Sequence, residues 1–274
     1  MKHILWACDF YKDSLFAGQI AAEIARRIGA SVHTIHIMRP PSHREKSMES
    51  WILRKKNLET RLESIASELS GNGIGVSYEI IESDGTGKAI LDKAERLHAD
   101  IIAMGRAGIP AEEDYAGSTV RQVLHGTRRP VLITRGMDMV PKIDRLLVTT
   151  DLSDASFVAL DFALPLARAF SAPVHLLFVY EYVDIPPTDE EMDKAIDDLR
   201  FALKARELSE GEVKPEVISH PESGEGIAKY ITANNIPLTV ISSRGASGIE
   251  RWLLGSTTER VIKMSLWPIL VVKE

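Results

Sequence analysis

The chain carries the same sequence pattern twice, and this repetition limits what it can fold into. Each copy opens with a short apolar run that ends in Asp, ILWACDF and LLVTTDL, so Asp151 follows Asp9 by 142 residues (151 − 9). The triplet Gly-Ser-Thr recurs near the end of each copy, at 117–119 and 255–257, with an offset of 138 (255 − 117). Landmarks in the same order at this long spacing indicate a duplicated domain rather than a solenoid, whose repeats are far shorter.

The length agrees with two domains. A chain of 274 residues divides into halves that can each bury a core, and we place them at 1–137 and 142–274, joined by a short linker. The formal net charge of −6 argues against a general binder of nucleic acid or anionic membranes, because such proteins need a basic face.

Cysteine content and apolar runs bear on the compartment. Cys8 is the single cysteine, so the sequence has no intramolecular disulfide and no cysteine-built metal site. The start of the sequence lacks a signal-peptide pattern, and no apolar run is long enough to span a bilayer. We therefore expect a cytoplasmic protein that does not engage membranes.

Strand and helix patterns alternate through both halves. Apolar residues three and four apart mark helices, for example in 156–169, 190–208, 225–234 and 257–264 of the second half. Between them lie short strands, predicted at 32–38, 76–81, 100–104 and 130–134 after the opening run, and at 146–150, 174–180, 216–219, 238–242 and 268–272. This alternation predicts an α/β fold, with two doubly wound, Rossmann-like domains of five parallel strands in tandem.

A doubly wound sheet binds ligands at the carboxyl ends of its strands, near the point where the strand order reverses. Two features of each half converge there: the Asp that ends the first strand and a glycine loop after the fourth. In the second half, Gly245 and Gly255 would let the backbone approach a ligand closely. Ser256, with Glu259 three residues on, predicts a capping box at a helix start that favours phosphate oxygens.

These motifs resemble the universal stress protein family over essentially the whole chain. The family pattern is a strand ending in Asp, then G-x-x-G, nine residues, and G-S/T before the last helix. The second half matches with Gly245, nine residues and Gly255-Ser256, while Ser242 stands in place of the first glycine. That serine matters if the position requires a positive φ.

The first half fits the same pattern with one difference. Gly105-x-x-Gly108 is intact, but eight residues rather than nine separate it from Gly117-Ser118. The occurrence of the motif twice in register makes the resemblance specific.

The resemblance implies the ligand and its contacts. Nucleotide-binding members of the family hold ATP in this crevice, whereas other members lack the motif and do not bind it. In the second half the resemblance assigns the adenine, packing and phosphate contacts to Thr150, Asp151, Val179, Ile241, Gly245, Gly255, Ser256 and Thr257. In the first half it assigns them to Asp9, Ile37, Met104, Gly105, Gly108, Gly117, Ser118 and Thr119.

The two glycine loops differ in charge. The second carries Arg244 and Arg251, which suit a triphosphate, and we add Arg244 to the predicted site. The first carries Glu112, Glu113 and Asp114, which either repel phosphates, point to solvent, or hold a metal such as Mg²⁺ that accompanies the nucleotide. We favour the second half as the better ATP site.

Other readings of the same residues stay open. Asp9 and Asp151 can simply cap the following helix. No catalytic constellation emerges, so we expect no enzyme, although slow ATP hydrolysis is compatible with the site. An interaction protein with empty pockets or another small ligand is the main alternative. An ATP pyrophosphatase-type ligase is disfavoured, because neither loop after the first strand contains the glycine that a phosphate-binding loop requires.

The edges of the sheets predict an assembly. Family domains commonly pair through their last strands, here 131–134 and 269–272, and an open parallel sheet has an apolar edge to cover. The short linker favours pairing within one chain over pairing between chains. We expect a pseudo-dimer of the two halves, with a homodimer of such chains as a further option.

Overall fold

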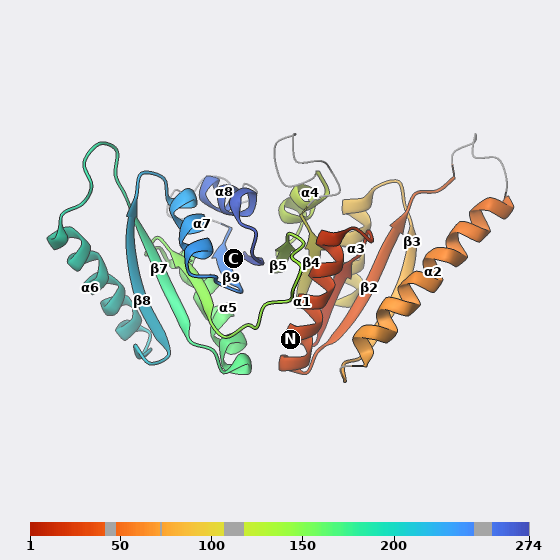
Figure 1. Cartoon of the computed structure of the whole chain (residues 1–274), viewed down its shortest axis with the longest axis horizontal. Helices are drawn as coiled ribbons and strands as arrows, with labels where there is room; N and C mark the ends of the chain where they lie inside the picture. The colour runs from red at the N-terminus through yellow and green to blue at the C-terminus, as the bar shows by residue number, and fades with distance from the viewer. Residues whose placement is uncertain (42–47, 72, 107–117, 244–253, 274) are drawn as a thin grey trace. The chain divides into compact units, whose positions relative to one another are not determined.

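The chain forms two compact units (Figure 1). The computed structural model describes residues 1–41, 48–71, 73–106, 118–243 and 254–273. Among these, the first unit reaches Val140 and the second begins at Pro141. The limits taken from the sequence, 1–137 and 142–274, remain predictions for pieces that fold independently.

The first unit alternates strands and helices along its length. Its elements are β1 (His3–Ala7), α1 (Lys12–Ile28), β2 (Ser31–Met38), α2 (Met48–Ser70), β3 (Val76–Glu82), α3 (Thr86–Leu97), β4 (Ile101–Gly105), α4 (Ser118–Gly126) and β5 (Val131–Thr134). All described strand pairs are parallel, and the strand order is β3-β2-β1-β4-β5. The order therefore reverses between β1 and β4.

The second unit repeats this plan. Its elements are β6 (Leu146–Thr150), α5 (Asp154–Phe170), β7 (Val174–Glu181), α6 (Asp189–Ala205), β8 (Val213–His220), α7 (Ser223–Ala233), β9 (Thr239–Ser242), α8 (Ser256–Met264) and β10 (Ile269–Val272). The parallel order is β8-β7-β6-β9-β10. Because α6 and α7 both contact β7 and β8 and flank them on opposite sides in Figure 1, helices cover both faces of the sheet. The predicted doubly wound fold is confirmed.

The duplication extends to the backbone register. Trp6 of β1 lies beside Thr34 of β2, and Val148 of β6 lies beside Leu176 of β7. Both partners recur after the same 142 residues (148 − 6 and 176 − 34). The first helices also match, since α1 and α5 are each 17 residues long and begin at equivalent positions. The repeat seen in the sequence is therefore a repeat of structure.

Most element boundaries differ from the sequence-based expectation by one to three residues, and two of the differences concern capping and strand β8. The capping box predicted at Ser256 is wrong: the N-cap of α8 is Gly255, which has no side-chain cap hydrogen bond. A capping box occurs instead at α6, where Thr188 and Glu191 exchange hydrogen bonds. Strand β8 starts three residues earlier than predicted and includes Pro215, which a strand at the edge of a sheet tolerates.

Helix lengths and composition also bear on membrane insertion. The longest helix, α2, has 23 residues but alternates charged and apolar side chains. Within the described ranges, no helix combines the length and apolarity that crossing a bilayer requires.

The two units fill the space between the first strand and the first helix with different residues. Trp6 is 1% exposed, and its indole Nε1 donates a 2.7 Å hydrogen bond to the Ser14 carbonyl. The ring lies so close to α1 that a Cβ on Gly18 would meet it at 2.4 Å. In the second unit the equivalent positions hold Val148 and Leu160, both fully buried. A large and a tiny side chain in one unit thus correspond to two side chains of middle size in the other.

This pairing predicts a strong coupling between Trp6 and Gly18. Trp6→Val should leave a cavity and cost about 3 kcal/mol of stability. Gly18→Leu should clash with the indole and cost about 2 kcal/mol. The double variant, which copies the second unit, should recover at least about 1 kcal/mol relative to the sum of the two. Urea unfolding of the full chain measures all three.

A control separates this coupling from general fragility. Leu62 of α2 is fully buried, on a helix other than α1. Leu62→Ala combined with Gly18→Leu should be additive. A double variant Trp6→Val, Gly18→Leu that is also merely additive would contradict the packing argument.

Candidate functional site

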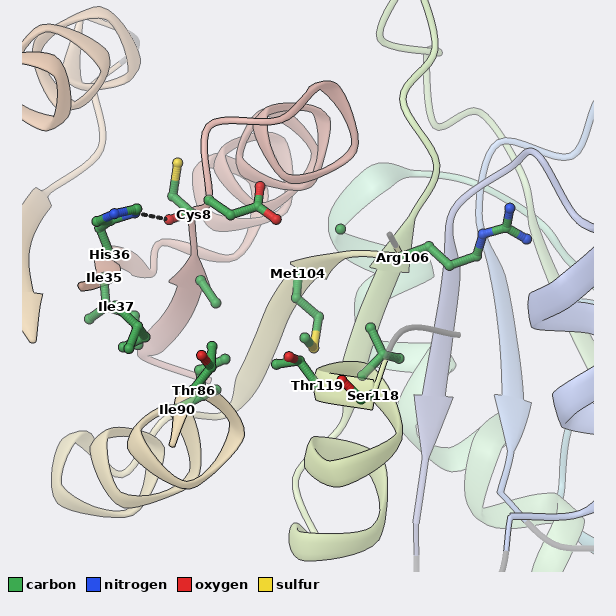
Figure 2. A pocket seen from close by; sticks show the side chains of 14 residues that line it. Cys8, Ile35, His36, Ile37, Thr86, Ile90, Met104, Arg106, Ser118 and Thr119 are labelled. Atoms are coloured by element: carbon green, nitrogen blue, oxygen red, sulfur yellow. Dashed lines mark hydrogen bonds between the residues drawn. The ribbon is translucent and has the colours of Figure 1, made fainter. Parts of the chain in front are cut away.

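A cavity of about 320 Å³ opens in the first unit where β1, β2 and β4 end and where α3 and α4 begin (Figure 2). These ends meet there because the strand order reverses between β1 and β4. The predicted site residues that line this cavity are Asp9, Ile37, Met104, Gly105, Ser118 and Thr119. Gly108 and Gly117, with the acidic residues Glu112, Glu113 and Asp114, lie outside the described residues.

A second cavity, of about 250 Å³, occupies the same place in the second unit. The predicted site residues that line it are Thr150, Asp151, Val179, Ile241, Gly255, Ser256 and Thr257. Arg244, Gly245 and Arg251 lie outside the described residues. In both units the predicted residues of the described ranges come together around one cavity, and the ligand that they contact stays a prediction.

The Asp at the end of β1 holds the loop that follows it. Asp9 Oδ1 accepts a 3.0 Å hydrogen bond from the Tyr11 N–H and a short one from the Ser14 hydroxyl. Between them Phe10 adopts a left-handed conformation with φ of 67°. Such a conformation is uncommon for a residue other than glycine, and the Asp9 carboxylate supports it by binding two residues that follow the turn.

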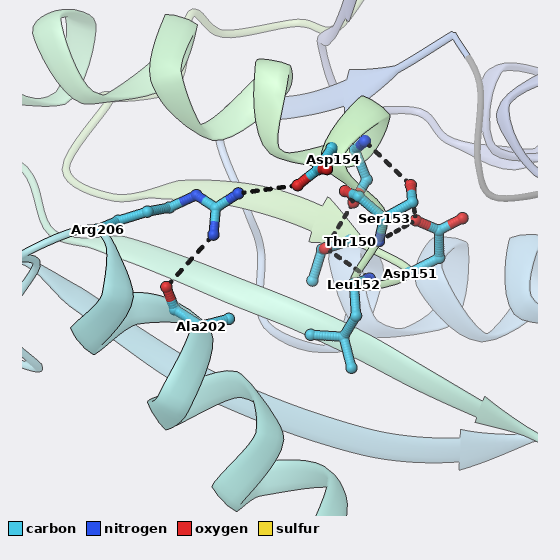
Figure 3. Close-up of polar contacts among 8 residues, drawn as sticks. Thr150, Asp151, Leu152, Ser153, Asp154, Ala202 and Arg206 are labelled. Carbon is cyan, nitrogen blue, oxygen red and sulfur yellow. Dashed lines mark hydrogen bonds and ion pairs between the residues drawn. The ribbon is translucent and has the colours of Figure 1, made fainter.

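The second unit repeats this turn (Figure 3). Asp151 Oδ1 accepts a 3.1 Å hydrogen bond from the Ser153 N–H, and Leu152 has φ of 65°. Thr150 Oγ1 accepts from the Leu152 N–H at 2.9 Å and lies 2.7 Å from the Ser156 hydroxyl. The N-cap of α5 is Ser153. The alternative that the aspartate itself caps the helix is therefore wrong: it orders the turn two residues earlier.

A polar wall of the first cavity is formed by Cys8 and His36 (Figure 2). His36 Nδ1 lies 2.8 Å from the Cys8 carbonyl oxygen, which can only accept, so Nδ1 carries the proton. Burial lowers the pKa of His36, which leaves the ring neutral at pH 7. Burial raises the pKa of the Cys8 thiol to about 11, as expected for a packed thiol rather than a nucleophile.

The serine at 242 is explained by space, not by dihedral angle. Neither Gly105 nor its equivalent Ser242 is among the residues of positive φ. At Gly105 a Cβ would lie 2.5 Å from the Ser14 nitrogen, because the start of α1 presses against the end of β4. At Ser242 the helix leaves room, and the hydroxyl donates a 3.0 Å hydrogen bond to the Ala155 carbonyl. The departure from the glycine pattern therefore fits the local packing.

The two helix starts around the second cavity differ in capping. Helix α8 begins after its N-cap Gly255, which has no side-chain cap hydrogen bond, and no side chain of the described ranges caps its first N–H groups. Helix α7 begins with its N–H groups bonded to carboxylates: Glu181 Oε1 accepts from Ser223 at 2.7 Å, and Glu222 accepts from Gly224 and Glu225. One helix start is thus open to an anion and the other is closed.

Several cavity residues were not expected from the sequence. Thr86 and Ile90 of α3 line the first cavity, and Ser223 and Ile227 occupy the equivalent places of α7 in the second. Glu181 is a further one. The topology offered a signal, because the third strand of each half also ends at this edge and its helix must begin there. Arg106 lines the first cavity too, but its side chain points away from the other labelled residues (Figure 2).

Comparison with known proteins agrees with the repeat. The sequence model of the universal stress protein family matches residues 1–135 and 142–273. The chain is 29% identical over 153 residues to universal stress protein MJ0531 of Methanocaldococcus jannaschii, which spans 52% of this chain and 88% of that protein. It is 28% identical over 146 residues to universal stress protein YxiE of Bacillus subtilis, with 47% and 99% covered.

Solved structures share the fold over the whole chain. A universal stress protein from Archaeoglobus fulgidus DSM 4304 superimposes with a TM-score of 0.75 at 22% identity, covering 99% of this chain and 96% of that one. Protein PA1789 from Pseudomonas aeruginosa PAO1, a protein of unknown function, gives 0.67 at 16% identity, with 100% and 92% covered. Identities this low establish the fold alone.

Because space is tight at Gly105 and not at Ser242, we expect alanine to destabilise the chain more at the first position than at the second. Gly105→Ala should push a methyl group into the backbone of α1 and destabilise the chain by about 3 kcal/mol. Ser242→Ala removes only a hydrogen bond and should cost about 1 kcal/mol. Urea unfolding midpoints compare the two. Equal costs would show that the close approach at Gly105 relaxes freely.

Proposed function

Because this chain belongs to the universal stress protein family, we propose that it is a stress-response regulator that binds an adenine nucleotide such as ATP. It acts through binding, by presenting a changed surface to partner proteins, and not through catalysis. We place it in the cytoplasm, in keeping with its single, buried cysteine.

The observation that carries the proposal is the uncapped start of α8 in the second cavity. Gly255, Ser256 and Thr257 line that cavity, and within the described part of the chain no side chain caps the first turn of α8. The backbone N–H groups of a helix start and the helix dipole favour negative charge, so the phosphates bind at this end. Thr150, Asp151 and the apolar Val179 receive the nucleoside, with Ile241 packing beside it.

Both cavities are small, so each would enclose only part of a nucleotide. Pockets for small molecules commonly measure about 300–1,000 Å³. The first cavity, at about 320 Å³, falls at the lower end of that range, and the second, at about 250 Å³, falls just below it. The second cavity therefore suits the nucleoside, with the phosphates at its rim.

We propose the second unit as the better ATP site. This preference rests on sequence: Arg244 and Arg251 in its loop attract phosphates, whereas Glu112, Glu113 and Asp114 in the other loop repel them. Each charge contributes on the order of 1 kcal/mol near the surface. In the described residues no three His, Cys, Asp or Glu side chains group as a metal site. A Mg²⁺ ion would enter with the nucleotide, bound to its phosphates.

The proposal includes that the protein does not catalyse a reaction. Asp151 lines the second cavity, but its Oδ1 already binds the Ser153 N–H and hydroxyl. Such a carboxylate orders a loop and is poorly placed to activate water. One observation distinguishes this proposal from the main alternative, an interaction protein that binds no nucleotide. Protein purified without added nucleotide and then denatured releases adenine-absorbing material under the first proposal only.

For assembly, we propose that the two units pair within one chain through β5 and β10, with a homodimer of chains as a further option. The separately expressed halves 1–137 and 142–274 should then associate in sedimentation experiments. A proline at Leu132 or Leu270 should weaken that association, because it removes a ladder donor. Halves that stay monomeric when mixed would overturn the arrangement.

A single substitution tests the phosphate site. Gly255 has φ of −65° and ψ of 145°, and a Cβ there would come no closer than 3.4 Å to the Ser243 oxygen, so Gly255→Val should fold normally. The branched side chain should block the phosphates. We expect calorimetry to show at least a tenfold loss of ATP affinity, about 1.4 kcal/mol.

Two matched variants complete this test. Gly117→Val, the equivalent change in the first half, should reduce total ATP binding less if the second unit is the better site. Gly211→Val, where a Cβ meets nothing closer than 3.7 Å, controls for the substitution itself and should leave binding unchanged. Unchanged affinity in Gly255→Val would show that the glycine loop does not cradle phosphates.

A further inference from the structure

The second cavity is electrically unequal at its two ends. On the β7 side, Glu181 is the last residue of the strand, and its Oε1 accepts a 2.7 Å hydrogen bond from the Ser223 N–H. Glu222 accepts from the next two N–H groups of α7, at 3.3 and 2.8 Å. On the β9 side, the N-cap of α8 is Gly255, and no carboxylate of the described residues accepts a hydrogen bond from the N–H groups that follow it. The protein's own negative charge already occupies the place that a bound anion would take on the β7 side.

The first cavity lacks this arrangement. The position equivalent to Glu181 is Arg39 (181 − 142), which is exposed and is not among the residues that line the cavity. The helix start equivalent to Ser223 is Thr86, which does line it, and the N-cap Gly85 offers no side-chain cap. The carboxylate is therefore a feature of the second unit and not of the shared fold.

Glu181 binds the start of α7 and also lines the second cavity. Its Oε1 is held by Ser223, while the residue as a whole lines the cavity and is exposed. An ionised carboxylate has no proton to donate, so it accepts hydrogen bonds only. A ligand group beside the carboxylate binds more tightly if it donates a hydrogen bond. It binds less tightly if it carries a negative charge or presents only a lone pair.

We propose that Glu181 is a specificity-determining residue of the second cavity, selecting a ligand whose end remote from the phosphates presents a neutral hydrogen-bond donor. This inference rests on the proposed nucleotide-binding function. Adenosine offers two kinds of donor, the exocyclic amine of the base and the hydroxyls of the ribose. Glu181 rejects the corresponding groups that cannot donate: the carbonyl of a hypoxanthine base, and a phosphate on the ribose.

Two probes distinguish these donors by calorimetry on the full chain, with AMP as the reference. Inosine 5′-monophosphate replaces the amine with a carbonyl, and adenosine 3′,5′-bisphosphate replaces a hydroxyl with an anion. Binding that Gly255→Val abolishes is assigned to the second cavity. The unmodified chain should bind AMP about tenfold more tightly than at least one of the two probes, as expected when one hydrogen bond to a charged group is lost.

Glu181→Gln is the decisive variant. Its amide oxygen can still accept from the Ser223 N–H, so the start of α7 keeps its partner, but the charge is gone and the amide NH2 can donate. The preference for AMP over the rejected probe should shrink to about threefold or less, with AMP affinity nearly unchanged. Asp184→Asn removes a like charge from the exposed loop three residues on, outside the cavity lining, and should leave the preference intact.

The outcomes separate the two proposals. If the unmodified chain binds no adenine nucleotide, the proposed function itself fails. If it binds AMP without preferring it over either probe, or if Glu181→Gln leaves the preference unchanged, nucleotide binding stands and the role of Glu181 is wrong. An equal effect of Asp184→Asn would show a diffuse field of the surface instead of a specific contact, and an equal loss for all ligands would show a structural role only.

Discussion

The site of each unit depends on the reversal of strand order between its first and fourth strands. The strand that follows β1 in the chain lies on one side of this pair and the strand that follows β4 lies on the other, as it does for β6 and β9, and a cavity lies in the gap at their carboxyl ends. Asp9 and Asp151 keep that gap open, because each fixes a tight turn with a left-handed residue before the helix. The cavities, the helix starts and the glycine loops all follow from this constraint.

The first helix of each unit transmits the packing of the core to the cavity. Its beginning touches the end of the fourth strand, through bare backbone at Gly105 and through a hydroxyl at Ser242. A shift of the helix along the sheet would therefore move both the aspartate turn and the floor of the cavity. Since Ser14 also binds Trp6 and Asp9, one residue links the centre of the first core to its cavity.

The sequence predicted the order of elements, and it predicted which described residues line the two cavities, because both follow from period and spacing. Apolar runs identify buried strands, and parallel strands bring their carboxyl ends to one edge. It could not predict the capping of the helix starts. Whether Gly255 or Ser256 is the N-cap depends on the backbone of one residue, and the part played by Glu181 depends on a neighbour 42 positions away at Ser223. Contacts of this kind exist only in the folded chain.

The different residues of the two cores limit how sequence can be exchanged between the halves. A tract of sequence copied from one half onto the other would make the halves more alike. Here a copied tract that brought Trp6 without Gly18 would place a clash in the second core, and one that brought Val148 without Leu160 would leave a void in the first. Short exchanges between the halves therefore damage folding, so each half is free to acquire its own chemistry at the same edge of the same sheet.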